Sequence, residues 1–200
     1  MGSQEFYVLQ ETYTDFASML EHKENEVELY ECMKCTAVMR IPKNEVKIYF
    51  KGNKTADFYS YSLWSIINQK LQDTLSEQSI TGFKLQDINF QGWFNKKGNS
   101  IEVPQAKELK EIVITGRAGL LRHKDGRILD HCSECKATSY KIKKTVDGLS
   151  VGLDEWDGSD MFCFTNWAGN IIVTQKVKDI IEKGNFKNIQ FTHINDFKFQ

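Results

Sequence analysis

The chain has 200 residues, 40% hydrophobic and 26% charged, a composition typical of a globular protein rather than a disordered one. No apolar run approaches the roughly 18 residues that a membrane-spanning helix needs, which argues against a membrane protein. The net charge of −1 argues against a general nucleic-acid binder. Residues 1–8 hold no basic segment followed by an apolar one, so we expect no secretory signal and a cytoplasmic location.

Hydrophobic periodicity predicts many short strands and few helices. Strands are expected at 6–9, 26–30, 38–41, 46–50, 82–85, 112–114, 161–164, 171–173 and 189–191. The alternation within 26–30 is typical of a strand with one buried face. One or two helical turns are expected at 15–22, and full helices at 69–78 and 175–183, capped by Asn68 and Thr174, with Gly184 as the left-handed residue after the second.

Two CxxC pairs contain four of the five cysteines: Cys32 with Cys35, and Cys132 with Cys135. A CxxC turn points two thiolates at one ion, and two such turns supply the four sulfur ligands of a structural Zn²⁺ site. Ninety-six residues separate the pairs, so a shared site requires the two halves of the chain to fold together. The alternatives are a redox pair or disulfide and unliganded thiols, although redox pairs usually begin a helix and extended sequence is predicted after both pairs, including 140–142.

Similar segments in the two parts of the chain indicate an internal repeat, the alternative being chance similarity of two amphipathic helices. The segment that begins at Asn68 aligns with the one that begins at Thr174 at an offset of 106, and the CxxC pairs repeat at an offset of 100. We therefore predict an α+β fold with two similar strand-rich lobes, each with one capped helix, joined by a zinc-ribbon-like clasp of the two CxxC pairs. The lobes would be residues 1–90 and 110–200 of a single domain, 1–200, with a polar connection at 91–109.

No catalytic apparatus is recognisable, so no catalytic or cofactor-binding residue is predicted besides the metal ligands. The four histidines lie beside no nucleophile motif, and no glycine-rich phosphate loop begins a helix. His131 adjoins Cys132 and is a candidate to contact the metal ligands or to replace one of them. Cys163 is expected in the core. The acids of the 154–160 loop are expected to be solvated rather than to form an active-site pair. Residues 1–31 carry eight acidic residues and one lysine, a net charge of −7 that is expected to form a solvated surface, the alternative being a site for a basic partner.

The spaced CxxC pairs and the closing block, 158–162 followed by 171–174 and its helix, resemble the double-CxxCG immunity proteins of bacterial polymorphic-toxin and contact-dependent antagonism systems. That family name implies a glycine after each second cysteine, where this chain has Thr36 and Lys136. The resemblance implies a small bacterial cytoplasmic protein that binds and neutralises a cognate toxin domain, with no catalysis of its own.

Two other functions remain open from the sequence. A zinc-ribbon-like nucleic-acid or transcription accessory protein would use bases near the cysteines, namely Lys34, Arg40, Lys43, Lys136, Lys141, Lys143 and Lys144. A thiol oxidoreductase would use one CxxC pair, although no helix is predicted to begin there. Neither a membrane nor a nucleic acid is the expected partner, and the sequence does not fix the oligomeric state.

Overall fold

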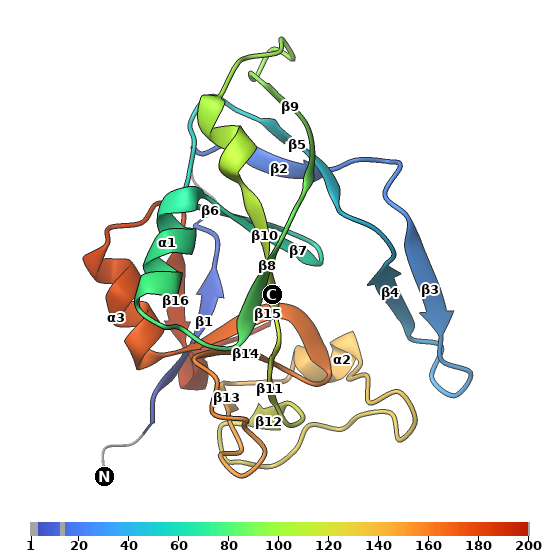
Figure 1. Cartoon of the computed structure of the whole chain (residues 1–200). Coiled ribbons are helices and arrows are strands. Elements are labelled where there is room, and N and C mark those ends of the chain that lie inside the picture. The colour runs from blue at the N-terminus through green and yellow to red at the C-terminus, as the bar shows by residue number, and fades with distance from the viewer. Residues whose placement is uncertain (1–3, 13–14, 200) are drawn as a thin grey trace.

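The computed structural model describes residues 4–12 and 15–199, so Met1 to Ser3 of the segment inspected for a signal lie outside it. In the described part, strands form five sheets and helices are few, so the protein is an α+β protein built mostly of sheets (Figure 1). None of the described helices is long and apolar enough to cross a membrane. The helices are α1 (Gln69–Glu77), α2 (Tyr140–Lys143) and α3 (Gln175–Lys183), with 3-10 turns η1 (Pro104–Glu108) and η2 (Ile194–Asp196).

The largest sheet has five strands in the order β11–β14–β15–β1–β16. These strands are β11 (Gly116–Ala118), β14 (Met161–Phe164), β15 (Trp167–Thr174), β1 (Phe6–Gln10) and β16 (Gln190–His193). A four-stranded sheet has the order β6–β7–β10–β8. Its strands are β6 (Phe58–Tyr61), β7 (Trp64–Ile67), β10 (Lys110–Ile114) and β8 (Phe83–Gln86).

Three smaller sheets complete the fold. A three-stranded sheet has the order β2–β5–β9, and two pairs are the β12–β13 ladder and the β3–β4 hairpin. The bounds are β2 (Ser18–Glu21), β5 (Lys47–Lys51), β9 (Asn89–Phe94), β12 (Arg122–His123), β13 (Leu149–Ser150), β3 (Val27–Glu31) and β4 (Val38–Pro42). The β3–β4 hairpin projects from the body and pairs with no further described strand (Figure 1).

Each of the two larger sheets incorporates a strand from the other half of the chain. In the five-stranded sheet, β1 lies between β15 and β16, antiparallel to both. In the four-stranded sheet, β10 lies between β7 and β8, again antiparallel to both. In each case the two flanking strands are joined by a nine-residue helix, α1 or α3. Residues before 90 and after 110 therefore interlock through these two sheets.

The helices α1 and α3 cover one shared hydrophobic core, where they lie side by side (Figure 1). Leu71 of α1 and Val177 of α3 are buried there beside Leu9 of the N-terminal strand. A second core packs the other face of the large sheet, and a third lies between β5, β6 and β9. In the third core the predicted polar connection contributes Trp93, which stacks on Phe50 with ring centroids 4.5 Å apart.

The predicted helices α1 and α3 are confirmed, but of these two only α1 has a side-chain hydrogen bond to its N-cap residue. Asn68 caps α1 because its side-chain oxygen accepts a hydrogen bond from the Leu71 amide at 3.0 Å. Thr174 occupies the equivalent position before α3 but makes no side-chain capping bond. Gly184 has a φ of −74°, so the prediction of a left-handed glycine was wrong, and Asn185 takes that conformation with a φ of 50°.

Three other predictions of local structure were wrong. Helical turns were predicted at 15–22, but Met19 pairs with Phe50 across the β2–β5 ladder and is buried there, so tertiary pairing outweighs local spacing. The stretch 140–142 was predicted as extended, but Ser139 accepts a hydrogen bond from the Ile142 amide and caps the short helix α2. The strand predicted at 26–30 exists as β3, yet neither of its faces is buried.

Candidate metal centre

The structure brings the four predicted ligands together. The thiol sulfurs of Cys32, Cys35, Cys132 and Cys135 all lie within 4.8 Å of one another, in the one such metal-ligating group that the described residues form. The Sγ–Sγ distance is 3.9 Å between Cys32 and Cys132 and 3.5 Å between Cys35 and Cys135. A disulfide would need about 2.05 Å, so all four are free thiols that lie close enough to hold a metal ion.

The two CxxC turns have the same backbone geometry although they lie in different surroundings. The first joins β3 to β4 at the tip of the hairpin, and the second precedes α2. In each turn the first cysteine donates its amide to the carbonyl five residues later and accepts the amide of the residue four positions later. The N–O distances are 3.0 Å (Cys32 to Ala37), 2.8 Å (Thr36 to Cys32), 2.9 Å (Cys132 to Ala137) and 3.0 Å (Lys136 to Cys132).

Thr36 and Lys136 adopt the left-handed conformation that a glycine would favour at these positions. Their φ angles are 57° and 63°. A side chain with a Cβ pays about 1–2 kcal/mol in this region, so the surrounding bonds must hold each turn in shape. The absence of glycine after each second cysteine therefore does not prevent the two turns from forming.

The distances fit a tetrahedral ion. Four sulfurs at about 2.3 Å from a central Zn²⁺ would lie about 3.8 Å from one another, within the spread of the distances described above. The amides of Cys135 and Glu134 lower the pKa of the Cys132 thiol to about 6, which favours the thiolate that binds metals. The Ala37 amide lowers the pKa of Cys35, but its bonds with the other thiols raise it more, to about 12. A cation among the sulfurs would neutralise the repulsion between neighbouring thiolates and so favour their deprotonated form.

The site lies at the surface and ties the two turns together. Cys32 is fully buried, whereas Cys35 is exposed. Lys34 of the first turn donates a 2.6 Å hydrogen bond to the hydroxyl of Ser133 in the second. The Glu134 carboxylate lies 3.9 Å from the Cys32 sulfur. These contacts bring the hairpin tip against the second half of the chain.

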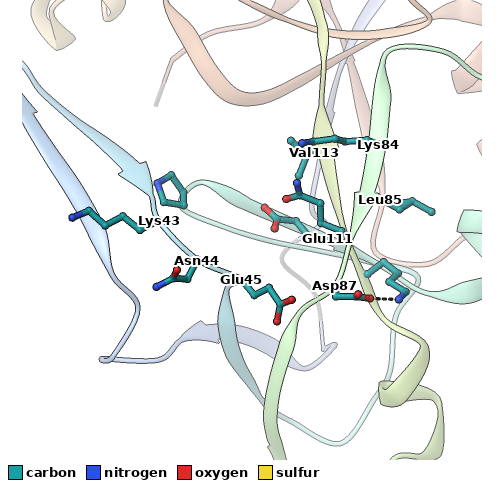
Figure 2. A pocket seen from close by; sticks show the side chains of 11 residues that line it. Lys43, Asn44, Glu45, Lys84, Leu85, Asp87, Glu111 and Val113 are labelled. Carbon is teal, nitrogen blue, oxygen red and sulfur yellow. Dashed lines mark hydrogen bonds and ion pairs between the residues drawn. The ribbon is translucent and has the colours of Figure 1, made fainter.

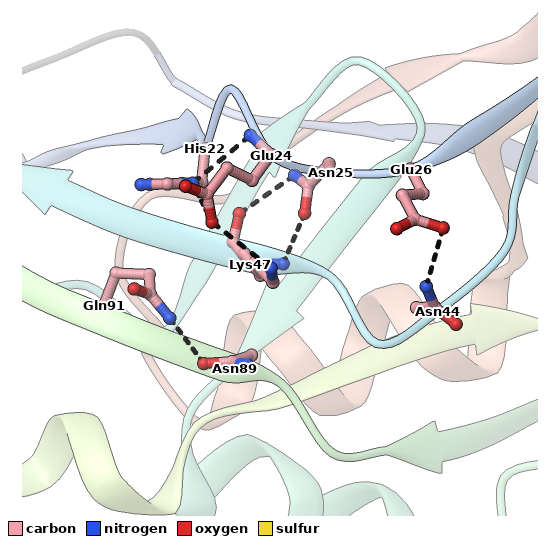
Figure 3. A network of polar contacts seen from close by, with 8 residues as sticks. All are labelled: His22, Glu24, Asn25, Glu26, Asn44, Lys47, Asn89 and Gln91. Atoms are coloured by element: carbon pink, nitrogen blue, oxygen red, sulfur yellow. Dashed lines mark hydrogen bonds and ion pairs between the residues drawn. The ribbon is translucent and has the colours of Figure 1, made fainter.

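A polar network fixes the other end of the hairpin (Figure 3). The Asn25 side chain donates to the Lys47 carbonyl at 2.9 Å and accepts the Lys47 amide at 2.7 Å. Glu26 accepts a 3.3 Å hydrogen bond from Asn44 across the hairpin base. The β3–β4 hairpin is thus attached to the body at its base and at its tip.

A hollow of about 840 Å³ lies between the hairpin base and the β8–β10 part of the four-stranded sheet (Figure 2). Glu111 and Val113 of β10 line it, together with Lys84 of β8. Burial raises the pKa of Glu111 to about 7, against the smaller opposing effect of Lys84. An ion pair between Lys110 and Asp87 lies on its rim.

The other sequence candidates have structural partners. The His131 ring nitrogen Nδ1 lies 2.9 Å from the Leu129 carbonyl, and His131 is outside the four-cysteine group. Cys163 is buried in β14, and burial raises the pKa of its thiol. In the 154–160 loop, Glu155 pairs with Arg122 at 2.8 Å, and the other bonded acids, Asp157 and Asp160, accept backbone amides.

Some of the N-terminal acids form ion pairs with bases of β4 and β5. Arg40 pairs with Glu21 at 3.0 Å, and Lys47 pairs with Glu24 at 3.4 Å. The hairpin that carries the first CxxC pair is exposed on both faces, which its alternating sequence did not predict. The sequence feature that indicates this exposure is the mixture of apolar residues and closely spaced glutamates in β3.

No family model matches the chain. A search of curated proteins likewise finds no match.

Proposed function

We propose that the four cysteines bind one zinc ion as a structural site. Zn²⁺ takes four thiolates in tetrahedral geometry without redox chemistry, and a site with four protein sulfurs leaves no open position for a substrate. Such an ion would act as the zinc-ribbon-like clasp between the hairpin and the second half. The free thiols suit a reducing compartment, so the proposed location is the bacterial cytoplasm.

We also propose that the chain is built of two similar lobes. Helices α1 and α3 begin 106 residues apart and have the same length, and each joins two strands that flank a strand from the other lobe. The matching hydrogen bonds of the two CxxC turns support the same relationship. In this arrangement the metal would lie between equivalent turns of the two lobes.

For the function, we propose a non-catalytic immunity protein that binds and neutralises a cognate toxin domain. The observation that carries the proposal is the closed set of four thiols, which would order a projecting hairpin rather than activate a substrate. The resemblance of the CxxC pairs and the closing block to double-CxxCG immunity proteins supports the same function. The protein would then neutralise the toxin domain by binding to its surface and blocking it.

The test is co-expression with a candidate toxin domain, taken from the C-terminus of a large secreted protein whose gene adjoins the gene for this chain. We expect rescue from that domain's toxicity and a stable complex on gel filtration. Toxicity without rescue, and no complex between the purified proteins, would overturn the proposed function. Metal analysis of the purified chain tests the zinc separately, with one ion expected per chain.

A nucleic-acid accessory role is the second candidate, and one observation favours it. The three lysines in and directly after α2, Lys141, Lys143 and Lys144, follow the second CxxC turn closely. This function predicts a mobility shift with DNA or RNA at low salt that weakens steeply as salt rises. The immunity function predicts no such shift.

A further inference from the structure

The β3–β4 hairpin carries an unusual share of the exposed apolar surface. Of the eleven large hydrophobic side chains that are exposed among the described residues, six lie between 29 and 41. They include Tyr30 at 51% exposure, Ile41 at 51% and Met33 at 92%. A concentration of exposed apolar side chains on one element points to an interaction site more strongly than the same side chains scattered singly would.

The register of the hairpin separates its two faces. On the inner face, the Arg40 guanidinium lies 5.9 Å from the centre of the Trp64 ring, and Pro42 lines the hollow beside β10. Side chains alternate along a strand, so Met39 and Ile41 point to the opposite, outer face. Their cross-strand partners there are Tyr30 and Glu28. We call these four residues the outer face of the hairpin.

The charges around the outer face are mostly acidic. Glu28 lies on it and forms no ion pair within the described part of the chain, whereas Glu31, which ends the same strand, lies on the inner face by the same alternation. Glu26 lies at the base of β3, where its carboxylate accepts a hydrogen bond from the uncharged side chain of Asn44. Lys43, just after β4, is the nearest base at that end. An apolar centre with an acidic rim is complementary to a basic protein surface.

These charges also argue against a second copy of the chain as the occupant. Antiparallel pairing of β3 with its copy would place Glu28 and Glu31 close to their counterparts, and like charges across a ladder are destabilising. A basic surface would meet no such repulsion. The attachment of the hairpin at its base and tip also lowers the entropy that binding would cost.

We infer that the outer face of the hairpin docks the cognate toxin domain, through a basic surface of that domain with an apolar centre. The inference rests on the proposed function and names the surface that performs it. Tyr30, Met39 and Ile41 supply the apolar centre, and Glu28 with its acidic neighbours selects the basic partner and speeds its approach.

The experiment measures the dissociation constant of the complex with the toxin domain named above, using the full chain. Tyr30→Ser and Ile41→Ser should each weaken binding about tenfold or more, because they remove buried anchors. The matched control is Leu153→Ser, which changes a side chain of 60% exposure on a different loop and should leave binding unchanged. Metal content and melting temperature of every variant confirm that the fold is retained.

A charge reversal provides an independent variant. Glu28→Lys should slow association about tenfold at low salt and less at high salt, whereas Glu77→Lys on α1 should not. Wild-type binding by the hairpin variants, beside a normal wild-type complex, would overturn the docking surface and leave the proposed function standing. No complex with the wild-type chain would overturn both.

Discussion

The carboxylate of Asp57 accepts a hydrogen bond from the backbone amide of Lys187, which lies 130 residues further along the chain. Asp160 makes the corresponding contact in the opposite direction, since its Oδ2 accepts the Thr81 amide at 3.0 Å. Each aspartate precedes a strand of one half and bonds the segment just before a strand of the other. Two buried or half-buried carboxylates thus join the halves reciprocally.

Removing either carboxylate should weaken the whole fold. Asp57→Ala leaves the Lys187 amide and the Asn68 side-chain amide without their acceptor, at a cost of about 2–3 kcal/mol of unfolding free energy. Urea denaturation measures this value. Asp130→Ala, at an exposed position, is the control and should change stability by less than about 0.5 kcal/mol. Equal effects of the two substitutions would refute a special role for Asp57.

Glycine should improve both CxxC turns. Thr36→Gly and Lys136→Gly remove the Cβ strain of a left-handed residue, which exceeds the added entropy of the unfolded chain, so each should stabilise by about 0.5–1 kcal/mol. Thermal unfolding with the metal bound measures the gain. Ala137→Gly, whose φ is not left-handed, should instead destabilise. A loss of stability at Thr36 and Lys136 would contradict the strain argument.

The two helix starts should respond oppositely to loss of their polar side chains. Asn68→Ala removes a capping bond and should cost about 1 kcal/mol. The Thr174 hydroxyl is buried and has no partner within the described residues, so Thr174→Val should stabilise by about 1 kcal/mol. Chemical denaturation of the two variants provides the comparison. Destabilisation by Thr174→Val would show that the hydroxyl does have a partner.

Glu111 should make stability depend on pH. Its pKa is raised to about 7 in the folded protein, so the folded state holds the proton more tightly than the unfolded state. That stabilisation is complete below the unfolded pKa of 4.5 and is lost as pH rises through about 7. At pH 8, Glu111→Gln should therefore be more stable than wild type by about 1–2 kcal/mol, less than the full shift implies because the hollow is open to water.

Urea denaturation of the two proteins between pH 5 and 8 tests this. The difference between them should narrow as the pH falls. Glu102→Gln, at an exposed position, is the control and should follow the wild-type curve. A difference that does not vary with pH would show that Glu111 does not titrate in this range.

Metal removal should release the hairpin tip. A two-stranded hairpin is at best marginally stable alone, so chelation should expose its backbone to protease. Trypsin should then cleave after Lys34 or Arg40, which the metal-bound protein should resist. Cys32→Ser with Cys132→Ser should lose the metal and be cleaved without chelator, whereas Cys163→Ala should keep the metal. Identical cleavage with and without chelator would refute the clasp.

Local chemistry in the sequence predicted the helices and the cysteine cluster but not the long-range pairing. Asn68 marks a helix start because a cap is a local interaction, and paired thiols have few structural uses beyond a metal or a redox centre. Met19 fitted a helix because its neighbours share a helical spacing, whereas its partner Phe50 lies 31 residues away. No local pattern could reveal that β1 pairs with residues beyond 170.

The alternation in β3 misled for a different reason. An apolar residue at every second position predicts a strand with one buried face, and that face normally belongs to the core. Leu29, on the alternating apolar face, instead remains 63% exposed and Val27 is only half-buried, because no other sheet or helix covers the tip half of the projecting hairpin. Alternation of apolar and polar residues predicts that one face of a strand makes contacts, but it does not predict whether the contact is made within the chain or with a partner.

The insertion of β1 between β15 and β16 has a consequence for synthesis on the ribosome. Val8 pairs with Ile172 on one side and Thr192 on the other, so β1 has no partner in this sheet until residues 171–193 have emerged. Folding of the five-stranded sheet must therefore wait for the synthesis of these residues, and it is slowed by the long loop that must close. During translation the first strand remains available to chaperones, and premature termination before residue 171 would leave it permanently unpaired.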